Sequence, residues 1–140
     1  CSQVLFLDSR GTGRVEEMGG MNVFFLVDGQ WITPRLTGTM LAGVTRDSIL
    51  QMSKDIGVPA VEGDLTLDEL IAGVQSGKIS EAFACGTAAT IVGISEFQVE
   101  NGPTLRFDPS PGPVTSKFYK SLIELQYGQR PDPYGWIQRI

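Results

Sequence analysis

The sequence predicts an α/β protein, on three observations. Apolar stretches of strand length alternate along the chain with helix-length segments that carry an apolar face. Residues that start and stop helices bound those segments. The resulting order strand–helix–strand–helix–strand is typical of α/β proteins. With 140 residues, 41% of them hydrophobic and 19% charged, we expect one domain spanning 1–140 with a substantial core.

The first expected elements are strands. Val4–Asp8, Asn22–Val27 and Trp31–Thr33 have strand length and composition. Asn22–Val27 is almost wholly apolar, so we expect it to be buried on both faces. Gly11–Gly13 is interpreted as a turn between strands, because it lacks the lysine and hydroxyl ending of a phosphate-binding P-loop.

Two helices follow, with a strand between them. The first is expected from Arg46 to Ile56, with Thr45 as its N-cap and the stop signals Gly57 and Pro59 after it. The second opens with a capping box, Thr66-Leu67-Asp68-Glu69, and ends at Gly77. The other expected elements, in chain order, are strands at Val61–Leu65, Ile79–Cys85 and Thr90–Phe97, a proline-rich loop at Glu100–Pro113, and a last helix capped by Thr115 that ends before Gly128.

Composition excludes several classes of function. The net charge of −5, without a cluster of lysines and arginines, disfavours nucleic acid as a partner. No apolar run approaches the roughly 20 residues that a membrane span needs. Because the chain contains no histidine, it cannot form a histidine-based catalytic triad or the common zinc sites, and we expect no metal.

The two cysteines, Cys1 and Cys85, are expected to be free thiols in a reducing compartment, which favours a cytoplasmic protein. Cys85 ends an apolar strand and is expected to be a small buried hydrophobe. The chain starts at Cys1 rather than at methionine. Three explanations stay open: a fragment of a longer protein, a hydrolase whose exposed Cys1 is the nucleophile, and a lipoprotein lipidated at Cys1.

Three short segments carry candidate chemistry. At Gly43-Val44-Thr45, a helix start offers unpaired N–H groups to an anion, although an ordinary capped helix explains the same residues. Gly86-Thr87-Ala88 is a turn at a strand end that could do the same, or a simple hairpin turn. Glu16 and Glu17 are adjacent, so on a strand they face opposite ways and make a poor glycosidase pair. They could form a solvated strand entry, but a buried carboxylate would need a cationic partner such as the protonated pyridine nitrogen of a cofactor.

Three segments in this order, EEMGGMNVFF, LTGTMLAGVTRDSIL and ISEAFACGTAA, closely resemble the C-terminal part of branched-chain amino acid aminotransferases. These are pyridoxal-phosphate enzymes of fold type IV. The resemblance covers nearly the whole chain. It implies the cofactor-binding domain of the D-amino acid aminotransferase-like fold, a mixed sheet or pseudo-barrel with packed helices. It also implies pyridoxal 5'-phosphate as cofactor and a homodimer when full length.

The resemblance implies roles for individual residues. Glu17 matches the carboxylate that contacts the pyridine nitrogen of the cofactor, which keeps the ring able to accept electrons. The other cofactor contacts that it implies are Leu41 on the ring face and Gly43, Val44, Thr45 and Thr87 at the phosphate. The implied substrate contacts are Gly20 and Met21 on the wall of the pocket and the backbone of Thr87 and Ala88 at the substrate carboxylate.

The chain lacks one residue of the family. The lysine that forms the Schiff base with the cofactor lies upstream of the strand matched by Val4–Asp8, and none of Lys54, Lys78, Lys117 and Lys120 matches it. The small N-terminal domain of the family has no counterpart here either. We therefore expect no catalytic residue in this chain and no activity from it alone.

For the full-length protein, the resemblance implies transamination between leucine, isoleucine or valine and 2-oxoglutarate. The alternatives are another fold-type IV enzyme, namely a D-amino acid aminotransferase or an aminodeoxychorismate lyase, and a truncated module that binds a ligand without chemistry. The enzyme interpretations take small molecules as partners, the truncated module takes a phosphorylated ligand or a partner subunit, and none involves a membrane or nucleic acid.

Overall fold

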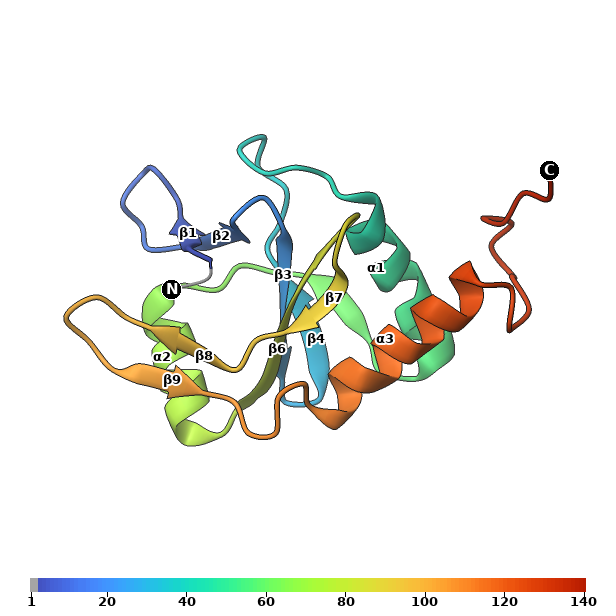
Figure 1. The fold of residues 1–140 in the computed structure, drawn as a ribbon. Coiled ribbons are helices and arrows are strands. Elements are labelled where there is room, and N and C mark those ends of the chain that lie inside the picture. Colours follow the sequence, from blue (N-terminus) through green and yellow to red (C-terminus); the bar gives the residue numbers. More distant parts are fainter. Residues whose placement is uncertain (1–2) are drawn as a thin grey trace.

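The computed structural model describes residues 3–140, which form a mixed sheet with helices on both faces (Figure 1). The α/β prediction is therefore confirmed. In chain order, the elements of this part are β1 (Leu5–Leu7), β2 (Val15–Met18), β3 (Asn22–Val27), β4 (Gln30–Thr33), α1 (Val44–Ile56), β5 (Ala60–Glu62), α2 (Leu67–Ser76), β6 (Ile79–Gly86), β7 (Thr90–Gly93), β8 (Glu96–Gln98), β9 (Thr104–Arg106) and α3 (Pro113–Gln126).

The main sheet has the strand order β5-β4-β3-β6-β7. Strands β4 and β5 run parallel, since α1 crosses between them, whereas the other neighbours are antiparallel. Strand β3 lies at the centre and pairs with β6 from Asn22 opposite Cys85 to Val27 opposite Ile79. This pairing brings the start of β3 beside the end of β6.

Residues of β3 alternate between two cores, one on each face of the sheet. Val23 and Phe25 belong to a cluster with α2 and β8–β9, while Phe24 and Leu26 belong to a cluster with α1 and α3. On the second face Phe24 stacks on Phe83, with ring centroids 4.9 Å apart. The prediction that this strand is buried on both faces is confirmed, and the apolar contacts of the second face hold α1 against the sheet.

Two predictions near the C-terminal half are wrong. The expected strand Thr90–Phe97 divides into β7 and β8, and the expected loop Glu100–Pro113 contains β9, which pairs with β8. At the division Pro111 packs on Gly93, where an added Cβ would come within 2.7 Å of the proline Cβ. Past this contact the chain leaves the main sheet, and β8 and β9 add Phe97 and Leu105 to the first core.

Both threonine N-caps predicted for the first and last helices are also wrong. Helix α1 begins at Val44 with Gly43 as its N-cap, so Thr45 lies in the first turn. Helix α3 begins at Pro113 with Gly112 as its N-cap, and the buried Thr115 bonds to a strand residue instead. Proline suits a first helical position because its missing N–H would have no partner there.

Other boundaries agree more closely. Strand β3 has the predicted bounds, β6 adds only Gly86, and α2 shows the predicted capping box between Thr66 and Glu69 and ends at Gly77. Strand β5 lies at Ala60–Glu62, slightly before the predicted Val61–Leu65. Along residues 3–140, no helix combines the length and the apolar character that crossing a bilayer demands.

Candidate functional site

The three segments singled out in the sequence meet at the end of the main sheet where β3 begins and β6 ends. We call this end of the sheet its edge. Asn22, at the start of β3, lies opposite Cys85 near the end of β6, just before the turn that contains Thr87 and Ala88. The Asn22 Nδ2 atom also donates a hydrogen bond of 3.0 Å to the Leu41 carbonyl, just before α1. The start of α1 and the turn after β6 thus lie on the same side of the fold (Figure 1).

A tight glycine turn places β2 beside this edge. Met18 and Met21 exchange two backbone hydrogen bonds of 2.8 Å, and Gly19 and Gly20 between them have φ values of 54° and 81°. A two-residue hairpin turn with positive φ at both central positions favours glycine. Met21 then reaches the end of β6, because a Cβ added to Gly86 would lie 3.6 Å from the Met21 Cγ. Gly20 itself is exposed.

The two adjacent glutamates of β2 have different surroundings. Glu16 is buried, and its Oε1 accepts hydrogen bonds from Thr39 Oγ1 at 2.9 Å and from Arg14 Nη2 at 3.4 Å. Glu17 is half-buried, and its Oε2 is shielded from solvent without any hydrogen-bond partner among the described residues. A shielded carboxylate oxygen without a donor is unfavourable. The Glu17 Oε2 can therefore accept a hydrogen bond from a donor that the described residues do not supply.

The start of α1 presents backbone N–H groups. Gly43 caps the helix with no side-chain hydrogen bond, and the Asp47 N–H donates to the Gly43 carbonyl at 3.1 Å. Helix geometry leaves the N–H groups of the three residues before Asp47 without intrahelical acceptors, and the helix dipole makes this end positive. Leu41 and Val44 beside it are strongly exposed, at 70% and 79%.

A buried arginine anchors this first helical turn. The Arg46 Nη2 atom donates to the Pro34 carbonyl at 2.9 Å and to Glu62 Oε1 at 2.6 Å. These bonds tie α1 to the segment after β4 and to the end of β5. Thr45, half-buried, lies next to Arg46 in the same turn. A cavity of about 320 Å³ borders the turn and is lined by Leu36, Ala42, Gly43, Val44, Arg46 and Asp47.

The turn after β6 is a hairpin that exposes Thr87 and Ala88. The prediction that this segment forms a hairpin turn is therefore confirmed. A turn in this position can still direct backbone N–H groups towards an anion near the α1 start.

Cys85, beneath the turn, is buried as predicted. Burial raises its pKa from 9.0 to about 12, although the nearby Arg46 charge acts in the opposite direction. The thiol is consequently neutral at physiological pH and is not an activated nucleophile. Cys1, the nucleophile of the hydrolase alternative, lies outside the described residues.

The lysines lie away from this edge. Lys54 is on α1 and Lys78 follows the Gly77 cap of α2, where it pairs with Asp28 at 3.7 Å. On α3, Lys117 donates to the Ile56 carbonyl at 3.1 Å, and Lys120 pairs with Glu124 at 3.8 Å. Within residues 3–140, no three cysteine, aspartate or glutamate side chains gather as a metal site would require.

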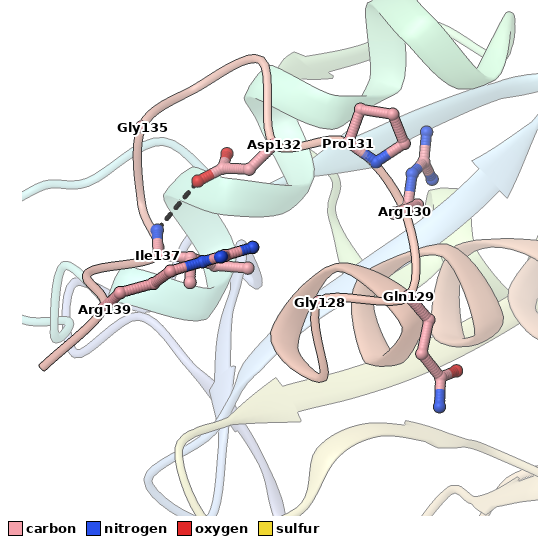
Figure 2. Close-up of a pocket in the computed structure, with 8 residues that line it drawn as sticks. All are labelled: Gly128, Gln129, Arg130, Pro131, Asp132, Gly135, Ile137 and Arg139. Carbon is pink, nitrogen blue, oxygen red and sulfur yellow. Dashed lines mark hydrogen bonds between the residues drawn. The ribbon is translucent and has the colours of Figure 1, made fainter.

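A cavity of about 620 Å³ lies elsewhere, between the end of α3 and the C-terminal segment (Figure 2). Arg130 and Arg139 line it, and Asp132 Oδ2 accepts a hydrogen bond of 2.8 Å from the Ile137 N–H. This bond lowers the pKa of Asp132. None of the site residues predicted from the sequence lines this cavity. The Asp132 carboxylate in it is already hydrogen-bonded within its own turn.

Among the buried polar residues that sequence reasoning missed, Asn22, Arg46 and Glu81 bind the starts of α1 and α3 or the segment before α1. Glu81 lies in β6 and binds the start of α3 through Val114 N at 3.0 Å and Thr115 N at 2.7 Å. A polar residue within an apolar strand was the available signal for Asn22 and Glu81. Arg46 carried no comparable signal, because charged residues in helices are mostly exposed.

Residues 1–97 match the family model of amino-transferase class IV. The chain therefore belongs to the class IV aminotransferases, which confirms the resemblance seen in the sequence.

Within that family, several of the similar proteins are branched-chain aminotransferases. The chain is 39% identical over 144 residues to the branched-chain-amino-acid aminotransferase of Mycolicibacterium smegmatis, covering all of this chain and 39% of that protein. It resembles the solved branched-chain amino acid aminotransferase of Escherichia coli with a TM-score of 0.79 and 29% identity, over 98% of this chain and 42% of that one.

A second solved structure, a branched-chain amino acid aminotransferase whose source is abbreviated T.th., is complexed with N-(5'-phosphopyridoxyl)-L-glutamate. It matches with a TM-score of 0.78 and 29% identity, over 99% of this chain and 42% of that one. The chain thus spans about two fifths of the length of the relatives that it matches.

Proposed function

We propose that this chain is the C-terminal part of the cofactor-binding domain of a branched-chain aminotransferase that uses pyridoxal 5'-phosphate. The full-length protein would exchange the amino group of leucine, isoleucine or valine with 2-oxoglutarate. The observation that carries the proposal is the shielded Glu17 Oε2 without a donor among the described residues, at the same sheet edge as the start of α1. The branched-chain substrates are supported by the relatives, which are 34–39% identical to this chain over the aligned residues.

The residues at the edge fit the two ends of such a cofactor. Glu17 would hold a proton on the pyridine nitrogen, since a shielded carboxylate is stabilised by a cationic donor. The N–H groups of Val44 and Thr45 at the start of α1 would bind the phosphate, with the close approach allowed by Gly43. The exposed Leu41 would pack on the ring face, and Thr87 would supply a further phosphate contact.

The cofactor supplies an electron sink for a carbanion, while the protein binds, orients and tunes it. The backbone of Thr87 and Ala88 would receive the substrate carboxylate, and Gly20 and Met21 would form the neighbouring wall. The shielded surroundings of Glu17 strengthen its electrostatic effect on the ring. The lysine that binds the cofactor and moves the proton would come from sequence outside these 140 residues, as would the small domain. A homodimer and a cytoplasmic location are part of the same proposal.

The first test measures transamination by the full-length protein and by the 140-residue chain. With pyridoxal phosphate, leucine and 2-oxoglutarate, the full-length protein is expected to form glutamate, and the chain alone is not. Activity with D-alanine instead of the branched-chain amino acids would favour the D-amino acid aminotransferase alternative. Turnover by the chain alone would show that one of its own lysines serves, and that the missing lysine was wrongly inferred.

The second test uses the adjacent glutamates of β2 as a matched pair. Glu17→Gln in the full-length protein is expected to lower kcat/KM for leucine by about 100-fold, the scale of losing one charge-stabilising group. Glu16→Gln is the control, because the amide Oε1 of glutamine can still accept from Thr39 and Arg14, so the substitution removes the charge and keeps the anchor to Thr39. Equal losses in the two variants would contradict the assignment of the pyridine contact to Glu17.

A further inference from the structure

Asn22 joins the central strand to the segment that precedes α1. It is the first residue of β3, it is only 7% exposed, and its Nδ2 donates to the Leu41 carbonyl at 3.0 Å. A buried amide in an apolar strand is costly unless it is hydrogen-bonded. The position therefore requires the bond that it makes, and this bond joins residues 19 apart in the sequence.

The same side chain also explains why residue 43 is glycine. Gly43 has φ −66° and ψ 136°, an extended conformation open to most residues, so its backbone does not demand glycine. However, a Cβ added at Gly43 would lie 2.3 Å from the Asn22 Oδ1. The amide of Asn22 thus occupies the space of that Cβ and contacts the turn at both Leu41 and Gly43.

The segment between β4 and α1 needs such fixed points. Residues 34–43 form neither helix nor strand, and they join the sheet to the residues proposed to face the cofactor. Thr39 is tied to Glu16 of β2 by a hydrogen bond of 2.9 Å, and Leu41 is tied to Asn22 of β3. Glu17 lies next to Glu16 in β2, and β3 follows β2 through the tight glycine turn, so both anchors hold the segment near Glu17.

We propose that Asn22 is a positioning residue that fixes Leu41–Thr45 relative to Glu17, and that Gly43 is required because the Asn22 amide fills the space beside it. The proposal rests on the proposed function of the site. A rigid cofactor spans a fixed distance between its ring nitrogen and its phosphate. The carboxylate on β2 and the N–H groups of α1 can bind both ends only if the segment between them is held in register.

The test measures the dissociation constant of pyridoxal phosphate in the full-length protein, by titrating the cofactor-free form and following absorbance. Asn22→Ala is expected to weaken binding about tenfold or more, since the half-buried hydrogen bond to Leu41 is lost and the segment before α1 is no longer held in register. Thr33→Val is the matched control: it removes another side-chain bond to a backbone carbonyl near the start of β3, Thr33 Oγ1 to Val23 O at 2.8 Å, but from a pair that includes neither Glu17 nor any of residues 41–45. It is expected to lower stability without changing cofactor affinity.

A double-mutant cycle tests the steric part of the proposal. Gly43 is also proposed to let the phosphate approach the backbone, so the cycle compares the thermal unfolding midpoints of the four proteins without cofactor. Gly43→Ala is expected to lower the midpoint in the wild-type background, but to add little to the loss caused by Asn22→Ala, because the Asn22→Ala protein lacks the Oδ1 atom that the new Cβ would meet. Additive losses in the midpoint would overturn the inference.

The outcomes separate this inference from the proposed function. A wild-type full-length protein that binds no pyridoxal phosphate would refute the proposed function. A wild type that binds it, with a folded Asn22→Ala protein within twofold in affinity, would refute only the role of Asn22. Should Asn22→Ala fail to fold, Asn22→Ser keeps a polar group at the strand start but cannot reach Leu41, and the same tenfold weakening is expected of it.

Discussion

The starts of helices α1 and α2 both contain a threonine, but the two threonines have different structural roles. At α2, the Thr66 side chain accepts from Glu69 N at 3.2 Å while the Glu69 side chain accepts from Thr66 N at 2.9 Å. At α1, the threonine lies inside the helix and the cap is a glycine without a side-chain bond. At the start of α2, the helix's own side chains accept from backbone N–H groups, and we call such a start closed. At the start of α1, the N–H groups remain available to a ligand.

Helix α3 supports the same distinction in another way. Its start is closed by Glu81 of the neighbouring strand β6, whose carboxylate accepts from two backbone N–H groups and from the Thr115 hydroxyl at 2.7 Å. A carboxylate from within the protein thus occupies the positive end of α3. The comparison teaches that this fold closes a helix start with its own oxygen atoms, unless the start belongs to the candidate site.

The largest expected effect comes from removing the carboxylate that Glu81 supplies to the start of α3. Glu81→Ala in the full-length protein should lower the free energy of unfolding by about 3 kcal/mol, because it leaves buried N–H and O–H donors without an acceptor. Urea unfolding measures this loss. Glu81→Gln retains one acceptor oxygen and should lose less. A loss below about 1 kcal/mol for Glu81→Ala would show that the closure of α3 adds little to stability.

The reverse experiment adds a carboxylate from the protein itself to the start of α1. Val44 is exposed, so Val44→Glu places a carboxylate in the first turn without disturbing the core. We expect pyridoxal phosphate to bind about tenfold more weakly, through repulsion of its phosphate, while stability stays equal or rises by about 0.5 kcal/mol through the helix dipole. Val44→Gln is the neutral control. Unchanged affinity in Val44→Glu would place the phosphate away from α1.

A third change tests the two threonines directly. Thr66→Ala should lower stability by about 1 kcal/mol through loss of the α2 cap, with no change in cofactor affinity. Thr45→Ala should change stability by less than about 0.5 kcal/mol, since Thr45 is not a cap, but should weaken cofactor binding. Thermal unfolding and cofactor titration of both variants provide the measurements. The same pattern of losses in both variants would remove the distinction between the two helix starts.

The smallest expected effect is on the reactivity of Cys85. Its thiol stays neutral, so it does not act as an anion beside the start of α1. Its pKa rises from 9.0 to about 12 on burial, so the thiolate is disfavoured in the folded state. A raised folded-state pKa contributes stability that is fully present below pH 9.0 and is lost as the pH rises towards about 12. Alkylation of the full-length protein, followed on the peptide containing Cys85, should therefore be slow at about pH 8 and fast only after unfolding. Rapid labelling in the native protein would contradict this burial.

The sequence alone predicted the parts of the fold that depend on neighbouring residues. The almost wholly apolar run of β3 predicted its bounds, and the capping box and glycine stop predicted α2. The ordered motifs also predicted the family, which the match over residues 1–97 confirms. The roles proposed for Glu17, Thr45 and Thr87 remain predictions.

Tertiary structure decided what depends on distant residues. The acceptor for the first N–H groups of α3 comes from Glu81, 33 residues before Val114, and the Asn22 amide meets Leu41, 19 residues later. Strand β9 is only three residues long, and its pairing with β8 could not be predicted from periodicity. Local patterns report what a residue prefers among its neighbours. Only the packed chain determines which buried donor or acceptor finds a partner, and therefore why the α1 start and Glu17 remain available to a ligand.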